Sequence, residues 1–286
     1  MRPTVLSLIT ILSIIIPCDI SAAEPDTTDT LRPVTSAYSL SAGGAEVADT
    51  YLSPLIYRGW NVGFYYERLQ AMKFSPENWI MQLSIGLNAS HSENPAGNAD
   101  MWQSNIDASW AMMRRWKLPY KFIVGVGGNT QLNIGAIYNP RNGNNPASAK
   151  AAWTIGVRAY ATYPVKWKNF NALLRWTGTM PVTGIFFSPQ YGELYYEIWM
   201  GNHSGLVRGV WWGNYMAIDN EFDLDISIGS TWLRLGYRSN IMSTKASEIT
   251  TRIIYNSFVL GITTEWISIK ANNLPSKNAR IISALY

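Results

Sequence analysis

The chain has 286 residues, of which 47% are hydrophobic, 13% aromatic and 15% charged, with a formal net charge of +4. A typical soluble domain carries about 25% charged residues, so the low charge content disfavours a protein whose whole surface is exposed to water. The aromatic content excludes a disordered chain. A mean hydropathy near zero excludes a bundle of membrane helices. The single cysteine excludes a disulfide scaffold, and no run of lysine or arginine indicates nucleic-acid binding.

Residues 1–23 are predicted to form a cleaved signal peptide. Arg2 precedes an apolar run over residues 5–16, which is too short to span a bilayer but fits the core of a secretory signal. Small residues at 21–23 favour cleavage before Glu24, which leaves 24–34 as a periplasmic segment. The alternatives are an uncleaved anchor helix and a lipid on Cys18, although bulky residues precede Cys18 where lipoprotein processing needs small ones.

Alternating hydrophobicity dominates the rest of the chain. From Trp79 to Ser90 every second residue is apolar, and from Gln82 onward the residues between are polar or glycine. The pattern returns in the stretches that begin at Trp102, Trp153 and Phe222, and period-2 alternation is typical of a half-buried strand. These stretches exceed the roughly 5–6 residues of soluble strands and match the ~10-residue strands of membrane barrels.

The fold class predicted is therefore all-β, a transmembrane antiparallel up-and-down β-barrel of about twelve strands over residues 35–269. The same pattern allows ten or fourteen strands, and a soluble periplasmic β-protein whose apolar faces pack together is the alternative fold. The predicted strands cover 35–47, 55–69, 78–90, 101–114, 120–137, 150–164, 169–181, 191–200, 205–217, 220–229, 231–239 and 250–268.

Short and long connections alternate, as periplasmic turns and extracellular loops do. An even number of strands places both termini in the periplasm. Residues 270–286 are predicted to be a periplasmic tail, with a further strand over 280–286 as the alternative. The short connections lie near 70–77, 115–119, 165–168, 201–204 and 230, and the long ones near 91–100, 138–149, 182–190 and 240–249.

Several short stretches resemble an uncharacterised family of outer-membrane-type proteins from Bacteroidetes, classed as domain of unknown function 3316. The resemblance implies a barrel and a location in the outer membrane, and it supplies no functional residues. It is carried by DTYLSPL at 49–55, LYYE at 194–197 with GN at 201–202, LRLGYRSN at 233–240, and SFVLG at 257–261.

A serine–histidine hydrolase is the enzymatic alternative. The only histidines are His91 and His203, each followed by a serine. Adjacent residues of a strand face opposite sides, so either histidine would need a serine from a neighbouring strand. His91 is predicted to lie in an extracellular loop and His203 in a periplasmic turn. We assign no catalytic residue and keep an outer-membrane lipid hydrolase as the alternative function.

No metal or cofactor is expected, because the two histidines are far apart in sequence and the cleaved chain has no cysteine. Glu221, Asp223 and Asp225 share one strand face and are interpreted as a polar lumen face rather than a calcium site. The glycine-rich residues 125–128 are interpreted as part of a strand and not as a phosphate loop.

The alternation directs many of the scarce charges into the lumen. Arginine suits this environment because it stays ionised and binds carboxylates through two parallel hydrogen bonds. The inward charges either cross-link and fill the interior, as in a structural or surface component, or line a narrow channel for small solutes. The predicted lumen residues are Glu67, Asp107, Arg158, Arg175, Glu193, Glu197, Asp223, Asp225, Arg234 and Arg238.

The expected partners are outer-membrane lipid and, during biogenesis, the barrel-assembly machinery. No nucleic acid is expected, and the oligomeric state stays open.

Overall fold

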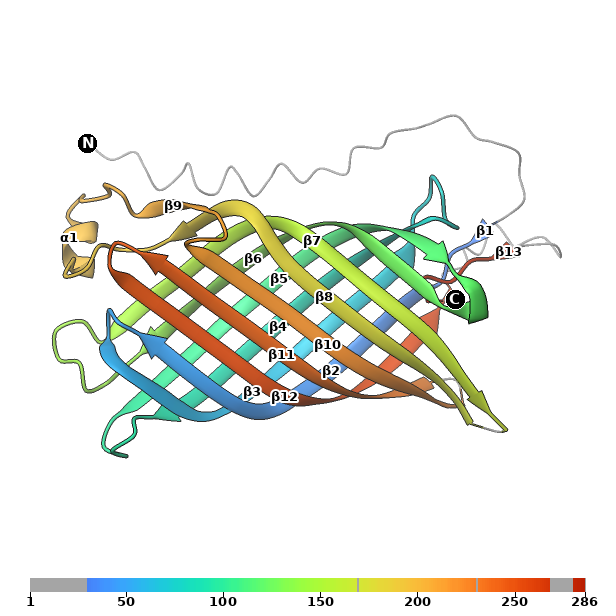
Figure 1. Ribbon diagram of the computed structural model, residues 1–286, viewed down its shortest axis with the longest axis horizontal. Coiled ribbons are helices and arrows are strands. Elements are labelled where there is room, and N and C mark those ends of the chain that lie inside the picture. Colours follow the sequence, from blue (N-terminus) through green and yellow to red (C-terminus); the bar gives the residue numbers. More distant parts are fainter. Residues whose placement is uncertain (1–29, 169, 230, 268–279, 286) are drawn as a thin grey trace.

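The computed structural model describes residues 30–168, 170–229, 231–267 and 280–285 (Figure 1). Within them, ten long antiparallel strands close into a barrel, because β8 pairs with β10 at the two ends of the strand order. The predicted signal peptide and most of the predicted segment 24–34 lie outside the described residues. The wall strands are β2 (Val34–Asp49), β3 (Ser53–Ala71), β4 (Trp79–Glu93), β5 (Asp100–Lys117), β6 (Ile123–Tyr138), β7 (Ala147–Trp167), β8 (Phe170–Phe187), β10 (Tyr215–Ile228), β11 (Thr231–Ala246) and β12 (Ile249–Trp266).

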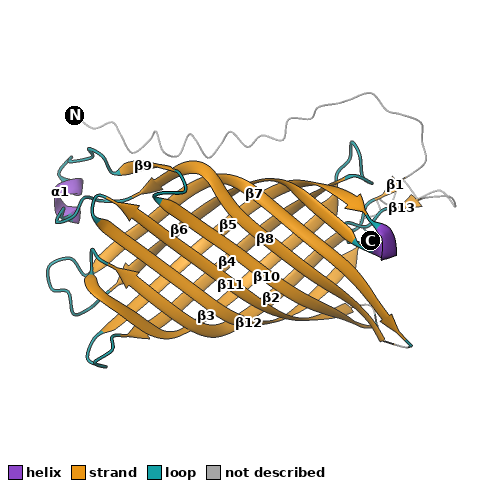
Figure 2. Ribbon diagram, viewed as in Figure 1, coloured by secondary structure: helices purple, strands orange, loops and turns teal. Residues whose placement is uncertain are grey.

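Five short elements accompany the wall (Figure 2). The helix α1 (Tyr195–Trp199) and strand β9 (Val207–Val210) lie between β8 and β10, and a 3-10 turn (Pro119–Lys121) joins β5 to β6. Strands β1 (Thr30–Leu31) and β13 (Arg280–Ile281) pair in parallel outside the barrel sheet. No helix in the described part of the chain is long and apolar enough to cross a membrane.

The two faces of the wall differ as the alternation predicts. On β4, Ile85 and Leu87 point outward and are 41% and 46% exposed, whereas Gln82 and Ser90 point inward and are buried. Closure pairs the backbone groups of every wall strand with a neighbour, and this lets a β-structure face an apolar solvent. Exposed rings near the strand ends include Trp102, Trp116, Tyr138 and Trp266.

The prediction of twelve strands is wrong by two. Residues 191–200 hold α1 instead of a wall strand, and 205–217 hold β9 and only the first residues of β10. This stretch is rich in rings, as the wall strands are. Gly192, Gly201 and Gly205 interrupt it with φ values of +81°, +110° and +71°, which are incompatible with an extended run.

The barrel has two distinct ends, which are at the left and right of Figure 1. We name the first the loop end, with connections at 50–52, 94–99, 139–146, 188–214 and 247–248. The second is the tail end, where β2 begins, β12 ends and the connections fall at 72–78, 118–122, 168–169 and 229–230. The connection 201–204, predicted at the periplasmic end, instead lies in the longest stretch of the loop end.

The described residues of the C-terminal tail fold into the tail end of the barrel. Ile282, Ala284 and Leu285 are buried, and Ala284 packs in a core cluster with wall residues. Arg115 on β5 donates a hydrogen bond of 2.6 Å to the carbonyl of Ser283. Residues 280–285 are therefore not a further wall strand, and Tyr286 lies outside the described residues.

Candidate functional site

The centre of the lumen is crossed by a network of arginine and carboxylate side chains. Arg175 on β8 donates to Glu67 on β3 at 2.5 and 2.6 Å and to Asp223 on β10 at 3.0 Å. Arg234 on β11 donates to the same Glu67 at 2.9 Å and to Asp225 at 2.8 and 2.9 Å. Since β12 and β2 separate β11 from β3, Glu67 connects strands across the lumen.

Water has almost no access to this central network. The side chains of Arg175 and Arg234 are 3% and 2% exposed, and that of Asp223 is 0% exposed. Paired guanidinium–carboxylate bonds are among the strongest in proteins and satisfy most of the buried polar atoms. The cavities beside the network measure only about 40 and 30 Å³, so side chains fill the middle of the lumen.

A second layer of polar contacts lies between the central network and the loop end. Arg238 pairs with Asp219, lies 3.6 Å from Glu221, and is positioned 3.9 Å from the ring centre of Tyr65. The cation thus meets two carboxylates and one aromatic face, and each of these stabilises its charge.

The carboxylate of Asp107 lies in the same layer among amides. Asn133 donates to it at 2.5 Å and Gln131 at 3.5 Å, and Asn105 and Asn88 also donate. Arg158, by contrast, donates to the hydroxyls of Ser84 and Ser109.

Eight of the ten charged residues assigned to the lumen by alternation lie inside the barrel. The structure brings five of them, Glu67, Arg175, Asp223, Asp225 and Arg234, into the central network. The other three are Asp107, Arg158 and Arg238.

The prediction that Glu193 and Glu197 line the lumen is wrong, because residues 188–214 form a loop-end connection. Glu193 is buried there and accepts hydrogen bonds from the backbone of Gln190 and the side chain of Asn202 at 2.9 Å each. Glu197 is exposed and accepts the backbone N–H of Leu194 at the start of α1. Both carboxylates therefore shape the loop.

Sequence reasoning also missed three lumen charges. Asp219 was overlooked because the predicted strands broke between 217 and 220, whereas β10 continues through this point. Continuing the alternation back from Glu221 would have found it. Lys150 and Asp49 form an ion pair of 2.7 Å at the loop end, and only the pairing of distant strands brings them together.

His91 and His203 are not placed as predicted. His91 lies within β4 and faces outward between the rings of Trp60 and Trp102, at centroid distances of 6.0 and 4.4 Å. His203 is exposed in the β8–β10 connection at the loop end. Ser92 is buried on the lumen side of β4, opposite to His91, so this neighbouring pair gives the hydrolase alternative no support.

One cluster outside the lumen has the donor set for a divalent cation. Potential ligand atoms of His91, Glu93 and Asp100 lie within 4.8 Å of one another on the outer face near the loop end. Glu93 and Asp100 are cross-strand partners, so the cluster depends on the register between β4 and β5. The spacing of the two histidines in the sequence gives no information on this register.

The loop end also carries a hydrogen bond between distant segments. Tyr51, in the turn between β2 and β3, donates 2.7 Å to the carbonyl of Glu193, and its ring packs edge-on against Tyr195. Burial and the neighbouring Tyr195 and carboxylates raise the pKa of Tyr51 to about 12, so the hydroxyl stays a donor at neutral pH.

A closed antiparallel barrel with an apolar outer face and a filled, charged interior defines a β-barrel of the outer-membrane type. The chain belongs to the family of proteins of unknown function DUF3316, which it matches over residues 5–273. This membership bears out the resemblance in the sequence but says nothing of a Bacteroidetes origin. No curated protein matches the chain.

Three solved barrels are similar to the chain. The β domain of the Bordetella autotransporter BrkA has 11% identity and a TM-score of 0.37, with 82% of this chain and 99% of that one covered. The transport unit of the Escherichia coli autotransporter AIDA-I has 7% identity and a TM-score of 0.32, with coverage of 87% and 94%. A Pseudomonas aeruginosa FadL homologue has 8% identity and a TM-score of 0.30, with coverage of 82% and 90%.

Proposed function

We propose that this protein is an outer-membrane β-barrel with a closed lumen, which serves as a structural or surface component and not as a channel or an enzyme. The observation that carries the proposal is the central network. Its five buried charges link β3, β8, β10 and β11 across the lumen. Ions that crossed this layer would have to break several buried ion pairs at once, which is energetically costly.

The outer membrane is supported by the outward apolar residues and by closure of the sheet. A lipid-facing strand must pair all of its backbone groups, and a closed barrel does so. The loop end, with its long β8–β10 connection, faces the cell exterior in this proposal, and the tail end faces the periplasm. Membrane lipid and the barrel-assembly machinery are then the expected partners.

Site-directed labelling tests the location and the orientation together. The only cysteine of the chain is Cys18, within the predicted signal peptide, so single cysteines can be introduced on a background free of thiols. Asn202→Cys at the loop end and Lys73→Cys at the tail end both replace exposed residues. A bulky, membrane-impermeant maleimide should label only Asn202→Cys in intact cells, and both variants after lysis.

Recovery of the wild-type chain in the outer-membrane fraction, with heat-modifiable migration on gels, is the accompanying expectation. A soluble periplasmic product, or labelling of Lys73→Cys alone in intact cells, would overturn the proposed location or orientation. Liposomes containing the folded protein should show no swelling in small sugars, because side chains fill the lumen.

A further inference from the structure

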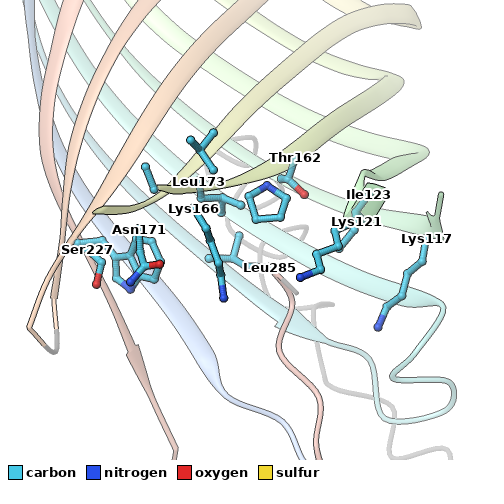
Figure 3. Close-up of a pocket in the computed structure, with 13 residues that line it drawn as sticks. Lys117, Lys121, Ile123, Thr162, Lys166, Asn171, Leu173, Ser227 and Leu285 are labelled. Atoms are coloured by element: carbon cyan, nitrogen blue, oxygen red, sulfur yellow. The ribbon is translucent and has the colours of Figure 1, made fainter. Parts of the chain in front are cut away.

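A cavity of about 510 Å³ opens at the tail end of the barrel, apart from the central network (Figure 3). We propose that this tail-end pocket binds an amphiphile with one apolar chain and an anionic head group. The pocket is bounded by inward residues of β7, β8 and β10 and by the C-terminal tail. Its volume falls within the range of roughly 300–1,000 Å³ that is typical of small-molecule sites.

The walls of the pocket are suited to an apolar chain. Ile123, Leu173 and Leu285 line it, together with Pro164 and Trp232. Leu285 belongs to the described residues 280–285 that fold into the barrel mouth, and the cavity lies beside them. Apolar surface that stays open in this way is stabilised by a ligand that removes it from water.

The described charged residues that line the pocket all have one sign. They are Lys117, Lys121 and Lys166, and none of the thirteen described lining residues carries a carboxylate. Within the described residues, none of these three lysines lies within 4.0 Å of a carboxylate. Lys150 in the lumen, by contrast, contacts Asp49 at 2.7 Å. Three unpaired cations beside an apolar cavity are complementary to an anion attached to an apolar chain.

The apolar wall lies deeper in the pocket, and the lysines lie at its mouth. In Figure 3, Lys117 and Lys166 extend away from the barrel body, whereas Leu173 lies closer to it. Lys121 belongs to a turn in which it and Tyr120 have φ values of 63° and 60°. Consecutive non-glycine residues in this region are strained, and the strained turn holds Lys121 beside the pocket. A chain inside and a head group at the mouth would satisfy both surfaces.

Native mass spectrometry of the folded protein in a neutral detergent tests the proposal with two probes that share one chain length. Dodecanoate should bind saturably with one molecule per chain. Dodecyltrimethylammonium has the opposite head-group charge. It should bind at least about tenfold more weakly, because its cation is repelled by the three lysines that attract the carboxylate of dodecanoate.

Matched variants separate charge from cavity. Lys117→Gln, Lys121→Gln and Lys166→Gln combined should weaken dodecanoate binding about tenfold. The control Lys73→Gln, Arg141→Gln and Lys245→Gln removes three exposed charges that do not line the pocket and should leave binding unchanged. Ser227→Phe, which fills the cavity, should abolish binding of the chain while heat-modifiable migration is retained.

The proposal is overturned by failure of dodecanoate to bind, by equal affinity for the two probes, or by unchanged binding in the pocket triple variant or in Ser227→Phe. It does not depend on a closed lumen, because the pocket lies at the tail end.

Discussion

The centre of the lumen and the tail-end pocket both have charged side chains, yet the charges are arranged in opposite ways. In the centre, Arg175 and Arg234 are buried and each contacts two or more carboxylates. In the pocket, Lys117, Lys121 and Lys166 are exposed and border an apolar cavity. Paired, buried charge fixes the structure, whereas unpaired charge beside open apolar surface is left for a ligand.

The side-chain chemistry follows the same division. The planar guanidinium of arginine binds carboxylates from two strands at once, as Arg175 and Arg234 do with Glu67. Lysine carries a compact charge on a flexible stem, which adapts to a mobile head group. Substitutions in the centre should therefore change mainly the stability of the barrel, whereas substitutions in the pocket should change mainly ligand binding.

The largest effect is expected for Arg234→Ala. It leaves Glu67 and Asp225 with one buried partner fewer, and breaking a buried ion pair in this way costs roughly 3–5 kcal/mol. The midpoint of urea unfolding, followed by heat-modifiable migration, should fall accordingly. Lys166→Gln is the matched removal of one cation in the pocket and should change the free energy of unfolding by less than about 0.5 kcal/mol. Similar losses in both variants would remove the contrast between the regions.

The contrast also requires that the wall separate the charged interior from lipid. Ile85 is 41% exposed on the outer face of β4, and Ile85→Arg should destabilise the folded barrel in bilayers by about 2–4 kcal/mol. Ile85→Leu keeps the apolar face and is the control. Unchanged stability of Ile85→Arg would show that the face of this strand has been misassigned.

Arg115→Met tests how the tail shapes the pocket. Arg115 is buried and donates to the carbonyls of Ser283, Pro76 and Glu77 at 2.6, 2.9 and 2.6 Å. Loss of these charge-assisted bonds should cost about 2 kcal/mol and raise hydrogen exchange of residues 280–285. Dodecanoate binding should weaken too, because Leu285 lines the pocket. Arg114→Met on the exposed face of β5 should do neither, and protection of the tail in both variants would contradict the assignment.

The smallest effect is expected at the loop end, which lies outside both regions. Burial raises the pKa of Tyr51 from 10.0 to about 12, so its contribution to stability is complete below pH 10 and is lost as the pH rises toward 12. Tyr51→Phe should cost about 1 kcal/mol at neutral pH and remove that pH dependence. Proteolysis of the β8–β10 connection measures both, and an identical pH profile in wild type and variant would exclude this role of Tyr51.

The sequence predicted the wall far better than it predicted the contacts inside. Alternation is a property of each strand alone, so it gave the inward face of β10 with Asp223 and Asp225. It could not give the contact of Glu67 with Arg175, residues 108 positions apart, since that depends on closure and register. The tail-end pocket could not be predicted from the sequence either, because its wall includes Leu285 from the folded-back tail.

The error at 191–217 has a local cause. The stretch is rich in rings, as the wall strands are, but three glycines with positive φ turn the chain into α1 and β9. Glu193 and Glu197 were assigned to the lumen through this error alone.

Planar-bilayer recording tests most directly whether the central network closes the barrel. Folded wild-type protein with heat-modifiable migration should insert and remain electrically silent, because Arg175 and Arg234 hold carboxylates across the lumen. Regular stepwise openings of the wild-type protein would contradict the closed lumen.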